Sequence, residues 1–159
     1  MPIIRDENKR KEIIDLLTQA YWMELETVMS YIANSINLDG VRAEEIKKSL
    51  AADVTEELNH AQQFGQRIKT LYGRVPGSAD FRSRQTYLQP PAENTDVTAV
   101  IKGVIQAEQG AIDHYMKIIS ACLEADPVTA DMVTTILADE EQHMRAFEGY
   151  LKEYEGSGK

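Results

Sequence analysis

The sequence contains almost no cysteine and no long apolar run. Its single cysteine, Cys122, cannot form an intrachain disulfide. No apolar stretch approaches the roughly 18 residues that a membrane span requires. The first residues, 1–11, are highly charged and lack the apolar segment of a secretion signal. From these absences we expect a reducing, cytoplasmic setting and no contact with a membrane.

Basic residues are also scarce. The chain has 17 lysines and arginines against 26 aspartates and glutamates, which gives a formal net charge of −9. Binding to nucleic acid requires a basic surface, and the basic residues between Arg5 and Lys11 are interrupted by acidic ones. We therefore expect no nucleic-acid partner. The acidic excess is better suited to binding cations.

Helical periodicity dominates the rest of the chain. Apolar residues recur at helical spacing over 5–37 and 43–72, in a segment that begins near Thr95 as N-cap, and in a segment that begins at Asp126-Pro127. The inward stripe of the last segment is expected to contain Met132, Ile136, Glu140, His143, Phe147, Tyr150 and Tyr154.

The lengths of the connections predict the topology. The first and last connections are short, so each pair of helices should form an antiparallel hairpin. The middle connection, 73–94, contains Pro76, Gly77, Pro90 and Pro91 and is long enough to run the length of a bundle. The sequence therefore predicts an all-α, antiparallel four-helix bundle with one long crossover between the second and third helices. We expect this domain to occupy residues 1–155, followed by a disordered tail at 156–159.

Two Glu-x-x-His motifs carry the chemistry. They are Glu57-x-x-His60 in the second helix and Glu140-x-x-His143 in the fourth. A single glutamate precedes each motif by about one helical hairpin, Glu24 in the first helix and Glu108 in the third. Positions i and i+3 share a helix face, so each motif can direct a carboxylate and an imidazole to the same point.

Together these residues form the ligand set of a two-metal carboxylate site. Carboxylate and imidazole ligands without thiolates favour iron or manganese. The alternative is a set of solvated or salt-bridged side chains, but a glutamate on an apolar stripe is unfavourable unless it is paired or metal-bound. Glu26 is the rival to Glu24, and it lies off the apolar stripe of the first helix.

Further side chains have weaker assignments. Glu56 and Asp139 directly precede the motif glutamates, and we expect each to accept a hydrogen bond from the histidine of the facing helix, although they could equally be surface charges. Asp53 remains undecided between an acid near the centre and a solvent-facing residue. His114 lacks an upstream glutamate and is expected to be an ordinary exposed histidine.

Two tyrosines follow the single glutamates at matching distances. Tyr31 lies two helical turns after Glu24, and Tyr115 lies two turns after Glu108. Each could donate a hydrogen bond to a ligand carboxylate or supply an electron during O₂ chemistry. Packing residues with a satisfied hydroxyl are the simpler interpretation.

These motifs resemble the ferritin-like superfamily, and within it the bacterioferritin group. The resemblance implies a ferritin-like bundle and a di-iron ferroxidase that oxidises Fe(II) with O₂ or H₂O₂ for iron storage and protection from oxidative stress. It implies two iron ions per subunit, with manganese or zinc as substitutes. The iron ligands would be Glu24, Glu57, His60, Glu108, Glu140 and His143, with Glu57 and Glu140 bridging the two ions.

The sequence also departs from the bacterioferritin pattern. Leu58 stands where bacterioferritins carry the haem-binding methionine, so haem is not expected there. No Cys-x-x-Cys pair is present, which excludes a rubredoxin module. The chain ends soon after His143, without the fifth helix typical of 24-subunit cages. We therefore expect a homo-oligomer smaller than 24 subunits, similar to the DNA-protecting mini-ferritin-like branch, or a dimer.

Two other functions fit the same residues. One is a di-iron oxygenase or peroxidase acting on another substrate, which would need an access pocket beside the metals. The other is a non-catalytic bundle in which the glutamates and histidines form a structural polar network.

Overall fold

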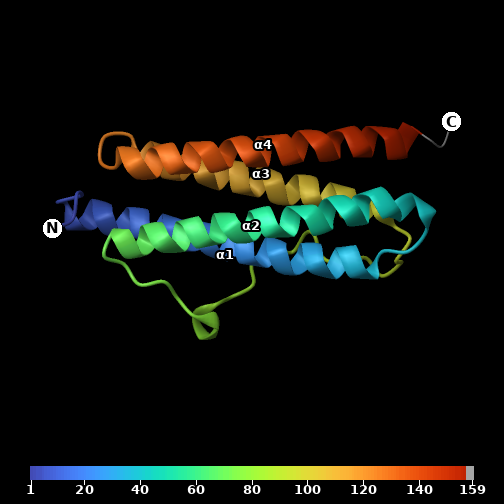
Figure 1. Cartoon of the computed structure of the whole chain (residues 1–159), viewed down its shortest axis with the longest axis horizontal. Helices are drawn as coiled ribbons and strands as arrows, with labels where there is room; N and C mark the ends of the chain where they lie inside the picture. The colour runs from blue at the N-terminus through green and yellow to red at the C-terminus, as the bar shows by residue number, and fades with distance from the viewer. Residues whose placement is uncertain (157–159) are drawn as a thin grey trace.

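The computed structural model describes residues 1–156, and four long helices make up most of them. They are α1 (Glu7–Asn37), α2 (Glu44–Thr70), α3 (Val97–Cys122) and α4 (Pro127–Gly156). Two short 3₁₀ turns, η1 (Val41–Ala43) and η2 (Ser78–Asp80), lie in the connections, and the described residues contain no strand. The all-α four-helix bundle predicted from the sequence is confirmed (Figure 1).

The helix ends follow ordinary capping chemistry. The Asp6 carboxylate accepts the backbone N–H groups of Asn8 and Lys9 at the start of α1. At the start of α3 the cap is Asp96, whose side chain accepts the N–H of Ala99, so the predicted N-cap at Thr95 is one residue early. At the other end of the chain Gly156 is still helical, which contradicts the predicted start of a disordered tail, and 157–159 lie outside the described residues.

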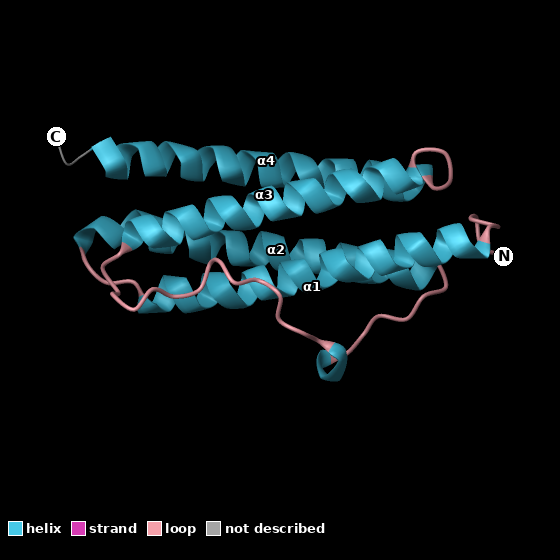
Figure 2. Cartoon of the chain, turned by 180° about the vertical axis from the view of Figure 1, so that it is seen from behind, coloured by secondary structure: helices cyan, strands magenta, loops and turns pink. Residues whose placement is uncertain are grey.

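The connections give the expected topology. Helix α1 packs along α2, and α3 packs along α4, as two antiparallel hairpins. The crossover between α2 and α3 runs from one end of the bundle to the other over the side formed by α1 and α3 (Figure 2). The amide of Asn34 on α1 donates to the carbonyl of Leu88 in this segment, at 3.0 Å. The crossover is therefore attached to the bundle and forms part of its wall.

Leu88 brings the crossover into close contact with α3. It adopts a positive φ of 63° and is buried. Its backbone faces Gly103, where an added Cβ would lie 2.9 Å from Leu88 Cα. Glycine at position 103 therefore permits this contact.

Two apolar clusters form the core, one toward each end of the bundle. One contains Ile13, Leu17, Phe64, Ile118 and Val133, and the other contains Ile46, Leu50, Ile101, Val104 and Phe147. Met132, expected on the inward stripe of α4, only packs at the edge of the core, because the buried face of α4 passes through Thr129, Val133 and Ile136.

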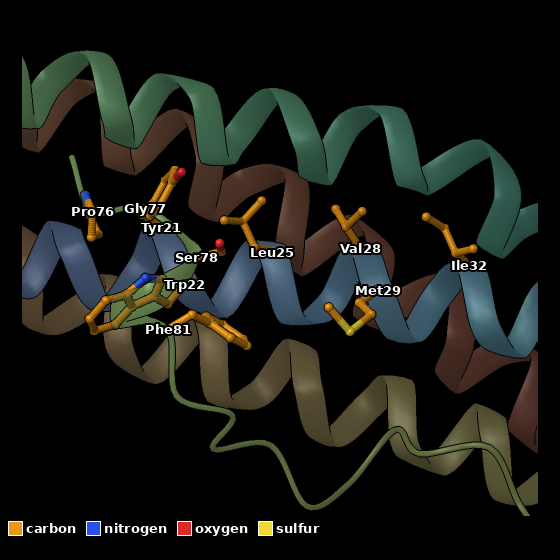
Figure 3. A pocket seen from close by; sticks show the side chains of 10 residues that line it. All are labelled: Tyr21, Trp22, Leu25, Val28, Met29, Ile32, Pro76, Gly77, Ser78 and Phe81. Atoms are coloured by element: carbon orange, nitrogen blue, oxygen red, sulfur yellow. The ribbon is translucent and has the colours of Figure 1, made fainter.

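An apolar groove lies on the outer side of α1. Its volume is about 460 Å³ (Figure 3). Helix α1 contributes Tyr21, Trp22, Leu25, Val28, Met29 and Ile32, and the crossover contributes Pro76, Gly77, Ser78 and Phe81.

Among residues 1–156, no helix combines the length and the hydropathy needed to cross a membrane.

Candidate metal centre

All four helices contribute to one buried cluster of carboxylates and imidazoles. It forms two overlapping groups, and within each group the candidate ligand atoms lie within 4.8 Å of one another. One group comprises Glu24, Glu57, His60 and Glu140, and the other comprises Glu57, Glu108, Glu140 and His143. Glu57 and Glu140 belong to both groups, which is the arrangement that bridging ligands between two ions require.

Most of the inward-facing atoms of this cluster have no hydrogen-bond partner. Within residues 1–156, eight buried side-chain nitrogen and oxygen atoms lack a partner. Six of them belong to the cluster: Glu57 Oε1 and Oε2, His60 Nδ1, Glu108 Oε2, Glu140 Oε1 and His143 Nδ1. His60 Nδ1 and Glu140 Oε1 approach to 3.0 Å without hydrogen-bond geometry. Unsatisfied buried donors and acceptors are unfavourable, so this set fits bound cations.

The outer nitrogen of each histidine is held by a carboxylate of the facing helix. His60 Nε2 lies 3.0 Å from Asp139 Oδ2 on α4. His143 Nε2 lies 2.9 Å from Glu56 Oε2 on α2. A carboxylate accepts the Nε2–H of the ring and leaves Nδ1, which faces the cluster, free to bind a metal. The two reciprocal contacts are the ones expected from the sequence for Glu56 and Asp139.

The two tyrosines also cross between helices. Tyr31 on α1 donates to Glu108 Oε1 on α3 at 2.7 Å. Tyr115 on α3 donates to Glu24 Oε1 on α1. Each hydroxyl thus fixes one oxygen of a terminal carboxylate and leaves the other for a cation. These contacts support the hydrogen-bonding role of the tyrosines.

Burial and crowding raise the pKa of some groups in this centre, whereas the pKa of Glu57 is lowered, against the effect of burial, by the neighbouring Glu24 carboxyl group and His143 imidazole. Burial, with the charges of Glu57 and Glu140, holds the pKa of Glu24 well above its usual range. Burial also raises the pKa of Glu140 to about 10. Burial by itself would lower the pKa of His143, but the adjacent carboxylates of Glu108 and Glu57 raise it to about 12. Divalent cations would replace these protons on binding.

Three other acidic or basic residues have different surroundings. Glu26 is buried, and its carboxylate accepts the backbone N–H groups of Arg84 and Gln85, so it anchors the crossover and stays outside the cluster. His114 is also buried, which contradicts the expectation of an exposed histidine, and its Nε2 lies 2.8 Å from the Leu16 carbonyl oxygen. Asp53 is half-buried, 3.8 Å from His143 Nε2.

One neighbour of the centre could not be found from the sequence. Gln85, in the crossover, lines a small cavity together with Glu24, Glu108 and Glu140. The crossover has no periodic pattern that would place any of its residues inward. Only its length indicated that it could pass the centre.

The fold and the cluster together define a class of protein: an antiparallel four-helix bundle built around a candidate two-metal carboxylate centre. The family model for the ferritin-like domain matches residues 14–157, and the chain belongs to that family.

Individual relatives support this membership. The chain is 24% identical over 143 residues to a bacterioferritin of Desulfovibrio desulfuricans, covering 89% of this chain and 75% of that protein. It is 30% identical over 148 residues to the DNA protection during starvation protein of Pyrococcus furiosus, covering 89% and 77%. Among solved structures, a dodecameric thioferritin of Bacteroides fragilis, described as bacterioferritin-related, superposes with a TM-score of 0.86 and 26% identity, covering 94% of this chain and 89% of that one. At the level of the family, these matches support iron storage and ferroxidase chemistry.

Proposed function

We propose that this protein is a ferroxidase that binds two Fe(II) ions as substrate and oxidises them with O₂ or H₂O₂, in iron storage and protection from oxidative stress. The observation that carries the proposal is the set of six unpartnered atoms on inward-facing carboxylates and imidazoles. An acidic, oxygen-rich ligand set stabilises the ferric product relative to Fe(II) because the higher charge interacts more strongly with carboxylates.

Each residue has a defined task in this proposal. Glu24 and His60 would hold one iron, and Glu108 and His143 would hold the other. Glu57 and Glu140 would bridge the pair, since both belong to each ligand group. Asp139 and Glu56 orient the imidazoles, and Tyr31 and Tyr115 orient the terminal carboxylates.

The electron balance requires both ions. With O₂, two Fe(II) each lose one electron, and O₂ takes up two protons to leave as H₂O₂. With H₂O₂, the same two electrons break the O–O bond, and two protons complete two water molecules. Manganese or zinc could occupy the same ligands, but zinc would not supply electrons. Haem is not part of this proposal, because Leu58 offers no ligand atom.

The size of the cavity beside the centre favours this reaction over the oxygenase alternative. The cavity lined by Glu24, Glu108 and Glu140 has a volume of about 10 Å³, which is the space that one water molecule needs. An organic substrate would not fit there. O₂ and H₂O₂, with two oxygen atoms each, are much closer in size to this cavity.

The oxidation rate of Fe(II) tests the proposal. Stopped-flow absorbance after mixing Fe(II) with protein and O₂ or H₂O₂ should show ferric formation faster than in buffer. Glu57→Gln, which removes a bridging carboxylate, should lower the rate at least about tenfold. Glu45→Gln is the matched control, because Glu45 lies on the surface of α2. A wild-type rate equal to that of buffer would overturn the proposal.

We further propose that the chain acts as a cytoplasmic homo-oligomer. Storage needs an enclosed space, and closed symmetry provides one. The groove of Figure 3 and the exposed side chains of Met29, Ile32 and Ile36 give α1 a continuous apolar face. Such a face is typical of a protein interface.

A further inference from the structure

The small cavity beside the metal centre adjoins a pit on the outer surface. The pit has a volume of about 160 Å³ and lies between α1 and the crossover, with Arg82, Arg84 and Tyr87 among its lining residues. Met23 and Gln85 line both the pit and the inner cavity. These two side chains are therefore the partition between solvent and the carboxylates of the centre.

Gln85 carries an unused hydrogen-bond acceptor at this partition. Its side chain is 9% exposed, and its Oε1 atom is buried without a partner. Its Nε2 donates to Thr27 Oγ1 at 3.1 Å and approaches the Met23 carbonyl oxygen at 3.5 Å. Because a carbonyl oxygen can only accept, this contact identifies the amide nitrogen and leaves Oε1 as the free acceptor.

The position of Gln85 is held from the backbone. Glu26 Oε1 accepts the N–H of Arg84 at 2.7 Å, and Glu26 Oε2 accepts the N–H of Gln85 at 2.8 Å. A carboxylate that accepts two backbone N–H groups fixes both peptides. The unpartnered oxygen is thus built into a rigid part of the crossover.

We propose that Gln85 Oε1 binds H₂O₂ in the inner cavity and positions it beside the metal centre, and that the pit is the route by which this oxidant enters. The proposal rests on the ferroxidase function proposed above. An unpartnered acceptor favours a ligand with a hydrogen to donate; of the two oxidants, H₂O₂ has two such hydrogens and O₂ has none.

The charge of the pit supports a neutral occupant over Fe(II). Arg82 and Arg84 line the pit, and the carboxylate of Glu26, which also lines it, accepts two backbone N–H groups. A divalent cation would be repelled there. By contrast, Asp53, Glu56 and Asp139 lie on α2 and α4, beside the two histidines of the centre, where cations would be attracted.

The bound H₂O₂ would be consumed in a balanced step. Its O–O bond breaks as each of two Fe(II) gives one electron. Each oxygen leaves as water after taking up one proton from solvent. Gln85 neither gains nor loses a proton and acts only as a positioning residue.

The ratio of the two oxidation rates tests this role. Gln85→Leu keeps the bulk of the side chain but removes the acceptor, so oxidation of Fe(II) by H₂O₂ should slow by about fivefold, while oxidation by O₂ stays within about twofold. Gln66→Leu is the control, because Gln66 is an exposed glutamine on α2, away from the crossover. An equal loss with both oxidants, or no loss with H₂O₂, would overturn the proposal.

A second experiment tests the binding of H₂O₂ without iron. Crystals of the metal-free protein soaked in H₂O₂ should show two-atom density in the inner cavity within hydrogen-bond distance of Gln85 Oε1, where unsoaked crystals show at most a single water, and soaked Gln85→Leu crystals should lack it. An empty cavity in the wild-type protein would overturn the proposal. If the wild-type protein oxidises Fe(II) with neither oxidant, the ferroxidase function fails, and the soaked crystals still show whether Gln85 binds H₂O₂.

Discussion

Glu140 combines burial with a bridging position, and this makes it the most informative single residue. It is 2% exposed, and burial raises its pKa to about 10. At neutral pH, burial therefore favours the neutral form of the carboxyl group when no cation is bound. Glu140→Gln then replaces one neutral group by another, so the free energy of unfolding of the metal-free protein should change by less than about 1 kcal/mol.

The same substitution should have a large effect once metal is added. A cation that binds only the folded state stabilises it, and the stabilisation grows with the ratio of cation concentration to dissociation constant. Mn²⁺ should therefore raise the melting temperature of the wild-type protein clearly and that of Glu140→Gln much less. Calorimetry with and without Mn²⁺ measures the rise in melting temperature of both proteins. An equal rise in the two proteins would show that Glu140 is not a ligand.

Asp139 tests the residues that orient the histidines. Because its carboxylate lies 3.0 Å from His60 Nε2, Asp139→Ala should leave the imidazole free to rotate and lower the affinity for metal by about 10- to 100-fold. Titration calorimetry measures that affinity. Glu141→Ala is the control, since Glu141 lies two residues further along α4 and is exposed. Equal affinities for the two variants would mean that Asp139 is only a surface charge.

At the scale of elements, Glu26 is the link between the crossover and α1. Glu26→Gln keeps one acceptor oxygen but turns an NH₂ group toward a backbone N–H, so one buried donor loses its partner. We expect a loss of about 1–3 kcal/mol in the free energy of unfolding. Urea unfolding of Glu26→Gln and of the exposed control Glu148→Gln gives the comparison. A loss below about 0.5 kcal/mol would mean that the crossover is held by other contacts.

The crossover also shows where prediction from sequence ended. The four helices and the cluster residues could be placed because helical periodicity puts Glu24, Glu57, Glu108 and Glu140 on the same faces as apolar residues. The position of Gln85 depends on contacts between distant segments, which no local pattern encodes. The burial of His114 was missed for a similar reason, because its partner is a backbone carbonyl of α1.

At the scale of the whole molecule, α1 presents the apolar face that we assign to self-association. Ile32→Glu places a charge at the edge of the groove (Figure 3) and should lower the mass in solution, because a buried unpaired charge disfavours an interface. Met116→Glu, an exposed position on α3, is the control. Light scattering with in-line mass measurement gives the mass in solution of the wild type and both variants. A wild-type monomer at micromolar concentration would contradict assembly.

The location of bound iron shows whether the buried cluster holds two metal ions. Crystals of the protein soaked anaerobically in Fe(II) can be measured at the iron absorption edge, where an anomalous difference map shows iron alone. We expect two peaks per chain between Glu57 and Glu140, one beside His60 Nδ1 and one beside His143 Nδ1. Peaks only at surface carboxylates, with the buried cluster free of iron, would contradict it.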